Sequence, residues 1–90
     1  MTWTLEYTRT AQKQIAKLDP QARRRIRAFL EERLARFDNP RQIGKALEGS
    51  RYAGVWRYRA GPFRILTRIE DARITILVLD VDDRKDIYRR

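Results

Sequence analysis

Four arginines alternate with aromatic and aliphatic residues in the stretch VWRYRAGPFRILTR, which covers residues 55–68. They are Arg57, Arg59, Arg64 and Arg68. A guanidinium group stays charged at physiological pH and can hold a phosphate through two parallel hydrogen bonds. Residues 51–69 contain five arginines and no carboxylate, so no acid within the segment neutralises them. The pattern favours contact with a polyanion; the alternatives are a solvated sheet face and a docking face for an acidic protein segment.

The same stretch predicts a β-hairpin, and the register of its strands decides whether the arginines share one face. Side chains alternate between the two faces along a strand. An even turn sets Arg59 opposite Arg64 and Arg57 opposite Leu66, which places all four arginines on one face, whereas an odd turn scatters them. We predict the even register, because it turns the aromatic residues inward and leaves no bare guanidinium group buried.

The elements that must position this hairpin begin with a strand and two helices. Apolar and polar residues alternate over residues 2–7, which predicts a strand with one buried face. Thr8 is a suitable N-cap for a first helix. Asp19 and Pro20 are suited to the N-cap and first turn of a second helix, whose apolar positions continue to about Phe37.

The remaining residues predict a connection and three strands. Residues 41–54 hold three of the four glycines and show no clear period, which is typical of a loop. Strands are expected at residues 55–59, 63–70 and 73–81, and the last, rich in β-branched residues, suits an interior position. The sequence therefore predicts one α+β domain over residues 1–90, in the order β-α-α-β-β-β. We expect a small, antiparallel-rich sheet of about four strands, with the helical hairpin on one face and a short C-terminal tail or helix.

Composition restricts the class of function. The 90 residues carry 21 basic and 12 acidic side chains, a net charge of +9, and neither cysteine nor histidine. A disulfide framework, a cysteine or histidine zinc site and a histidine general base are thereby excluded, so we expect no metal and no cofactor. No stretch approaches the roughly 20 apolar residues of a membrane helix, and the N-terminal residues lack a signal-peptide pattern. We expect a cytoplasmic protein with an anionic partner and no contact with membranes.

Three stretches give the chain a resemblance to a known family. They are LEYTRTAQKQIAKLD, VWRYRAGPFRILTRIED and ILVLDVDDRKDIYRR. Together with the order of elements, they resemble the RelE/ParE superfamily of toxins from type II toxin–antitoxin systems over nearly the whole chain. The R-x-R strand, the Gly-x-[FY]-R turn and the terminal R-x-x-x-Y look like the RelE branch. That resemblance implies a metal-independent endoribonuclease that cuts messenger RNA on the ribosome and inhibits translation.

The resemblance also implies a catalytic set, namely Arg57, Arg59, Arg64, Arg84 and Tyr88. In such enzymes the 2′-hydroxyl of the RNA attacks the adjacent phosphorus and leaves a 2′,3′-cyclic phosphate. The arginines would stabilise the developing charge, and Tyr88 could stack on a base. Arginine is a poor general base. Candidates for the proton transfer are Tyr88, Tyr58 if it faces outwards, and Asp83.

Further basic residues are candidates for RNA contact beyond the reacting phosphate. They are Arg51, Arg68, Arg23, Arg24 and Arg27. The last three lie on the expected second helix, and for any one of them a solvated helix face is as good an interpretation. Asp82 and Asp83 depart from the family pattern, in which many relatives have Gly-His or a similar pair. These carboxylates could hold Arg84 by an ion pair or cap a C-terminal turn.

Two other functions stay open. A ParE-like protein would inhibit DNA gyrase by protein binding, and a non-catalytic RNA-binding domain would need the arginines but no chemistry. The resemblance implies as partners a cognate acidic antitoxin of the RelB type, the ribosome and messenger RNA. Because the ribosome would supply part of the alignment, we expect little cutting of free RNA.

Overall fold

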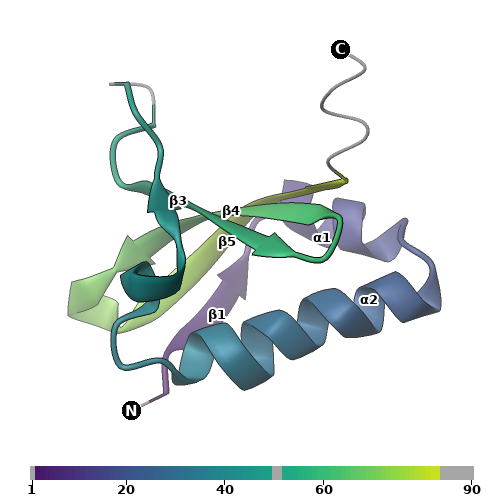
Figure 1. The fold of residues 1–90 in the computed structure, drawn as a ribbon, viewed down its shortest axis with the longest axis horizontal. Helices are drawn as coiled ribbons and strands as arrows, with labels where there is room; N and C mark the ends of the chain where they lie inside the picture. The colour runs from purple at the N-terminus through teal and green to yellow at the C-terminus, as the bar shows by residue number, and fades with distance from the viewer. Residues whose placement is uncertain (1, 50–51, 84–90) are drawn as a thin grey trace.

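A computed structural model describes residues 2–49 and 52–83 of the chain (Figure 1). The described part forms one mixed sheet with helices packed against it. The strands are β1 (Thr4–Tyr7), β2 (Lys45–Ala46), β3 (Val55–Ala60), β4 (Phe63–Glu70) and β5 (Thr75–Asp83). The helices are α1 (Arg9–Ala16) and α2 (Pro20–Arg27), and α2 continues as a wider turn, η1 (Ala28–Arg33), and a tighter one, η2 (Leu34–Arg36). Short 3₁₀ turns are η3 (Pro40–Ile43) and η5 (Asp71–Arg73).

The sheet has the strand order β1-β5-β4-β3-β2. Strand β1 runs parallel to β5, and every other pair is antiparallel. The predicted fold class, and the interior position of the last strand, are confirmed. The sheet has a fifth strand that the sequence did not reveal, because β2 spans only two residues within a segment without periodicity.

Both helices begin at the predicted caps. The hydroxyl of Thr8 accepts a hydrogen bond from the Ala11 amide (3.1 Å), and the carboxylate of Asp19 accepts one from the Ala22 amide (2.8 Å). These bonds satisfy amides that a helix otherwise leaves without partners in its first turn. The end of α2 differs from a regular helix, since its hydrogen bonding changes from α to π at Ala28 before the chain turns.

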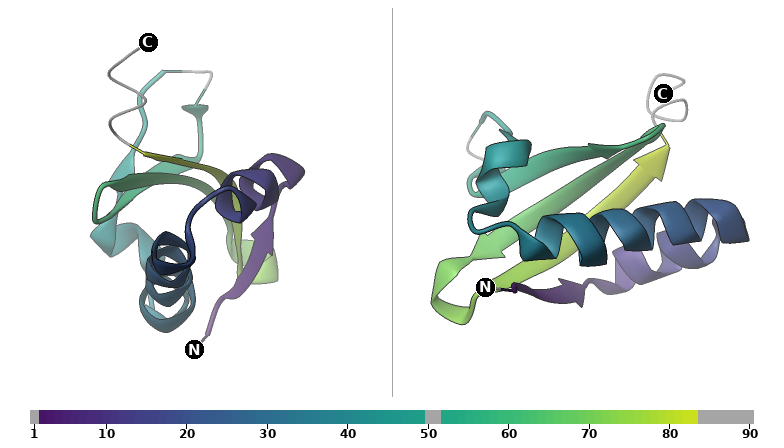
Figure 2. Two further views of the ribbon diagram at one scale, coloured as in Figure 1. Left: turned by 90° about the vertical axis from the view of Figure 1, so that its right-hand side faces the viewer. Right: turned by 60° about the horizontal axis from the view of Figure 1, so that its bottom comes forward.

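The apolar side of the long helix covers one face of the sheet. Ile26, Leu30 and Leu34 are fully buried and belong to one core with Tyr58 and Ile65 of the hairpin strands. Helix α2 lies across this face, and α1 lies beside it near the end of β5 (Figure 2). No helix of the described residues covers the opposite face of the hairpin. In the part of the chain that the structure describes, no helix has the length and apolarity needed to cross a membrane.

A glutamine side chain completes the sheet where β1 ends. Strand β1 stops at Tyr7, so the edge of β5 beyond that point has no neighbouring strand. The amide of Val81 donates to the side-chain oxygen of Gln14 on α1 (2.7 Å), and the side-chain nitrogen of Gln14 donates to the Asp80 carboxylate. Gln14 thus replaces a strand and fixes the end of β5 beside the hairpin.

Candidate nucleic-acid interface

The hairpin of β3 and β4 adopts the predicted even register. Arg59 lies directly opposite Arg64, and Arg57 lies opposite Leu66. Arg68 lies opposite Val55 on the same face. The turn is Gly61-Pro62, and Gly61 has φ +62°, a left-handed conformation that glycine adopts without steric cost. The four arginines therefore share the sheet face that points away from the helices; we call Arg57, Arg59, Arg64 and Arg68 the arginine face.

The charges of the arginine face are largely uncompensated. Arg59 and Arg68 are exposed, whereas Arg57 and Arg64 are half-buried. Arg68 donates to the backbone carbonyl of Ala53 (3.0 Å). Within residues 2–49 and 52–83, no hydrogen bond or ion pair joins the guanidinium group of Arg57, Arg59 or Arg64 to another residue. A strong hydrogen-bonding surface is therefore available to an anion.

Lys45 extends the arginine face, and the sequence analysis did not identify it as a site residue. Strand β2 pairs with β3 so that Lys45 lies opposite Arg57, which puts both cations on the same face. Two like-charge pairs thus lie across neighbouring strands, Lys45 with Arg57 and Arg59 with Arg64. Pairs of this kind destabilise a sheet. Only the two-residue strand reveals the role of Lys45, and no sequence pattern predicted that strand.

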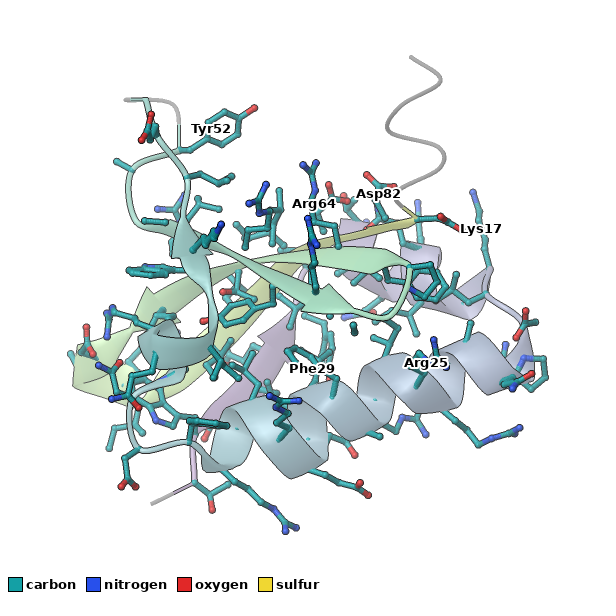
Figure 3. All side chains as sticks on the ribbon, viewed as in Figure 1. Lys17, Arg25, Phe29, Tyr52, Arg64 and Asp82 are labelled. Carbon is teal, nitrogen blue, oxygen red and sulfur yellow. The ribbon has the colours of Figure 1, made fainter. Side chains whose placement is uncertain are left out.

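Strand β5 borders the arginine face with acid. Asp82 lies opposite Arg64, and Figure 3 shows both side chains on the side of the sheet away from α2, the side on which Tyr52 also lies. Asp83 lies opposite Phe63, whose side chain is buried on the other face. The register therefore turns Asp83 away from the arginines, which makes it a poor candidate for proton transfer among them.

Tyr58 faces inward and is not a general base for this face. Its side chain is 2% exposed, its ring packs against Phe29, and its hydroxyl donates to the buried carbonyl of Pro40 (2.9 Å). Burial raises the pKa of Tyr58 to about 12. A phenol that holds its proton so firmly and lies under the sheet cannot take one from a ligand on the opposite face.

Comparison with known proteins shows the family. The family model described as "ParE toxin of type II toxin-antitoxin system, parDE" matches residues 5–88. Toxin RelG of Mycobacterium tuberculosis is 38% identical over 90 residues, which cover both chains in full. The chain belongs to the RelE/ParE superfamily of type II toxins.

Solved structures agree with this membership. A chain of the RelBE2 toxin–antitoxin complex of Mycobacterium tuberculosis superposes on this toxin with a TM-score of 0.83, at 31% identity and 92% coverage of each chain. A chain of the intact RelBE complex of E. coli gives a TM-score of 0.69 at 23% identity, covering 90% of this chain and 95% of that one. The second likeness concerns the fold alone.

The helical arginines of the toxin do not lie on the arginine face. Arg23, Arg24 and Arg27 belong to α2, which packs on the opposite side of the sheet. Arg23 donates to the carbonyls of Ala16 (3.4 Å) and Leu18 (3.2 Å), so it also ties α2 to the end of α1. These three residues form a separate basic surface, and their contact with RNA stays a prediction.

A different helical arginine reaches the hairpin. The side chain of Arg25 lies against the turn, so closely that a Cβ atom at Gly61 would collide with its guanidinium group (Figure 3). Arg25 therefore adds a cation at the tip of the hairpin, next to the strand ends that carry Arg59 and Arg64. Helical periodicity could not single it out, because the turn that it contacts is distant in sequence.

Three residues proposed from the sequence lie outside the described residues. They are Arg51, Arg84 and Tyr88. Their roles in the toxin, including the meeting of Tyr88 with the arginine face, stay predictions.

Proposed function

We propose that this toxin is a ribosome-dependent endoribonuclease that cuts messenger RNA and inhibits translation. The observation that carries the proposal is the pairing of Arg59 with Arg64 on an open sheet face. Like charges set opposite each other cost stability, and a site for a polyanion gives a reason to keep them. Membership of a toxin family that includes RelE supports the same function.

The proposed reaction uses the RNA as its own nucleophile. The 2′-hydroxyl attacks the adjacent phosphorus, the bond from phosphorus to the 5′ oxygen breaks, and a 2′,3′-cyclic phosphate and a 5′-hydroxyl end form. Arg57, Arg59 and Arg64 bind the non-bridging oxygens and stabilise the negative charge of the phosphorane. Arg84 adds to this stabilisation. The chemistry requires no metal and no cofactor.

The reaction also moves two protons, one from the 2′-hydroxyl and one to the leaving 5′ oxygen. Among the candidates considered, Tyr58 is buried and Asp83 is turned away. We assign the proton step to Tyr88, or to a group on the ribosome. The ribosome also holds the message in line for attack, which is why free RNA should be a poor substrate.

The test is to express the toxin and map the 5′ ends of cellular messages. Cuts phased with the codons are expected for the wild type. They should be lost in Arg64→Ala and Arg84→Ala and strongly reduced in Tyr88→Phe. Arg36→Ala, which removes an exposed arginine outside the arginine face, is the matched control. Unchanged cutting by Arg64→Ala, or rapid cutting of free RNA by the purified protein, would contradict the proposal.

Gyrase inhibition is the second candidate function, since the family model that matches is named for ParE. The same experiment separates the two. DNA damage with intact messages would favour gyrase as the target. Retention of RNA binding without cutting of messages or damage to DNA would favour a non-catalytic RNA-binding domain.

The proposed protein partner is a cognate acidic antitoxin. Similar toxins have been solved in complexes with RelB antitoxins, including the RelBE2 complex. The net charge of +9 favours an acidic partner. Since the antitoxin would bind only the folded toxin, it should also raise the stability of this small domain. The other proposed partners are the ribosome and messenger RNA, in the cytoplasm.

A further inference from the structure

A pocket opens where the sheet loses its outermost strand. Strand β2 pairs with Trp56 and Arg57 of β3, and in the part of the chain that the structure describes no strand pairs with the following residues of β3 on this side, so they lie at an open edge. A pocket of about 420 Å³ lies beside this edge. One wall comes from β3, another from η1 of the long helix, and the third from residues 42–45. We call it the edge pocket.

The charges that line the edge pocket are positive as far as the structure describes the chain. Its described lining includes Arg33, Lys45, Arg57 and Arg59, and no carboxylate. Among the described residues, the side chains of Arg33 and Lys45 make no hydrogen bond and no ion pair. Four cationic residues that line one hollow favour an anionic ligand, because an anion relieves their mutual repulsion.

The walls of the edge pocket are held in place. The Tyr58 hydroxyl donates to the Pro40 carbonyl (2.9 Å), which ties β3 to η3. Gly44 sits directly on the Tyr58 ring, where a Cβ atom would come within 2.6 Å of Cε1. The phenyl ring of Phe29, which packs against Tyr58 (6.1 Å between centroids), gives the pocket an aromatic wall. The pocket is thus a built concavity and has the size of a small-ligand site.

We propose that the edge pocket binds a phosphate group of the RNA strand, one that neighbours the reacting phosphate. The inference rests on the proposed nuclease function and extends it. Arg57 and Arg59 line both the arginine face and the edge pocket. An RNA strand that lies across that face would therefore continue around the open edge of β3. Arg33, which lies on the helix side of the sheet, and Lys45 provide the contacts specific to this second phosphate.

The test measures RNA binding as a function of salt. The ligand is a single-stranded oligoribonucleotide whose 2′-hydroxyls are methylated, so that it cannot be cut, and the readout is fluorescence anisotropy with the full chain. Loss of one phosphate contact should lower the slope of log K against log salt by about 0.7, which is about a fivefold weaker affinity at 0.1 M salt. We expect this change for Arg33→Gln and for Lys45→Gln, whereas Arg33→Lys, which keeps the charge, should retain most of the slope.

The control is Arg9→Gln, which removes an exposed cation at the start of α1, outside the edge pocket. It should leave the slope within error of the wild type. Shortening the oligonucleotide to a single phosphate should abolish the difference between Arg33→Gln and the wild type, because the edge pocket would then be empty.

The outcomes distinguish this inference from the proposed function. If the wild type cuts cellular messages in phase with codons but Arg33→Gln and Lys45→Gln bind RNA like Arg9→Gln, the edge pocket is not an RNA site and only this inference falls. The same holds if these variants weaken antitoxin binding alone. If the wild type neither binds RNA nor cuts messages, the proposed function fails and the inference fails with it.

Discussion

Replacing Arg59 by glutamate should make the toxin more stable and remove its activity. Arg59 lies opposite Arg64 on one side and at the open edge of β3 on the other, so Arg64 is its cross-strand neighbour. A directly opposed pair of like charges costs about 0.2–1 kcal/mol, and an opposed pair of unlike charges contributes about as much. Arg59→Glu converts the first into the second, so the free energy of unfolding should rise by about 0.4–2 kcal/mol.

The assay is thermal and urea unfolding of the purified toxin at low salt. For a domain of this size, each kcal/mol corresponds to about 4–8 °C in Tm, so the expected rise is about 2–16 °C. Any removal of positive charge from a chain of net charge +9 could stabilise it. Arg36→Glu, at an exposed position outside the hairpin, is the control for that general effect.

Salt provides the second control, because the interaction between the two side chains is screened at high ionic strength. The advantage of Arg59→Glu over Arg36→Glu should shrink in 1 M salt. Cutting of messages should be lost in Arg59→Glu and retained in Arg36→Glu. If Arg59→Glu is no more stable than Arg36→Glu at low salt, the guanidinium groups do not repel each other across the hairpin, and the argument for a polyanion site loses its energetic basis.

Other predictions concern the supports of the site. Tyr58→Phe leaves the buried carbonyl of Pro40 without its donor, so the free energy of unfolding measured in urea should fall by about 1–3 kcal/mol; catalytic loss in a variant of unchanged stability would contradict the structural role. Gly44→Ala places a methyl group against the Tyr58 ring and should cost about 1–3 kcal/mol in the same assay, whereas an unchanged midpoint would show that the ring can move aside. Because the pKa of Tyr58 is raised from 10.0 to about 12, the folded state keeps a proton that the unfolded state releases, so stability should decline as pH rises above about 10, and less so in Tyr58→Phe. The hydrogen bond from Arg41 lowers the pKa of Asp71 from 3.8. The stability that this pair contributes is therefore present above that pH and is lost as the pH falls further. When unfolding is measured as a function of pH in acid, the free energy of unfolding should decline less in Asp71→Asn than in the wild type.

Local patterns were sufficient for most of the fold. The caps at Thr8 and Asp19 and the turn at Gly61 depend on residues close in sequence, and each lies where the pattern predicts. The even register could also be predicted, because the alternative would have buried guanidinium groups. Strand β2 could not, since two residues pair with β3 only after η3 has brought them there.

The residues of the candidate site also fall into those that local patterns predict and those that depend on long-range contacts. The arginines of β3 and β4 could be assigned to one face because strand parity is a local property. Contacts made across the fold could not be predicted. The place of Lys45 in the site depends on β2, that of Arg25 on the packing of α2 against the hairpin turn, and that of Arg33 on the pocket at the open edge of β3. Strand parity alone puts Asp82 and Asp83 on opposite faces, but the pairing of β5 with β4, which no pattern within β5 determines, decides that Asp82 is the one on the arginine face.

The positions of the cations favour a ligand that passes from one side of the sheet to the other. A protein that only needed a soluble surface could spread its charge, yet here Lys45 of β2 opposes Arg57 of β3, and Arg59 of β3 opposes Arg64 of β4 on the same sheet face. Arg33 continues the series beyond the edge strand, where β2 is too short to close the sheet. A longer β2 would pair the rest of β3 and stabilise the sheet, but it would also fill the edge pocket. The proposed RNA site would give the short strand and the repelling pairs one explanation, in which the edge of β3 stays open for the backbone of an RNA strand.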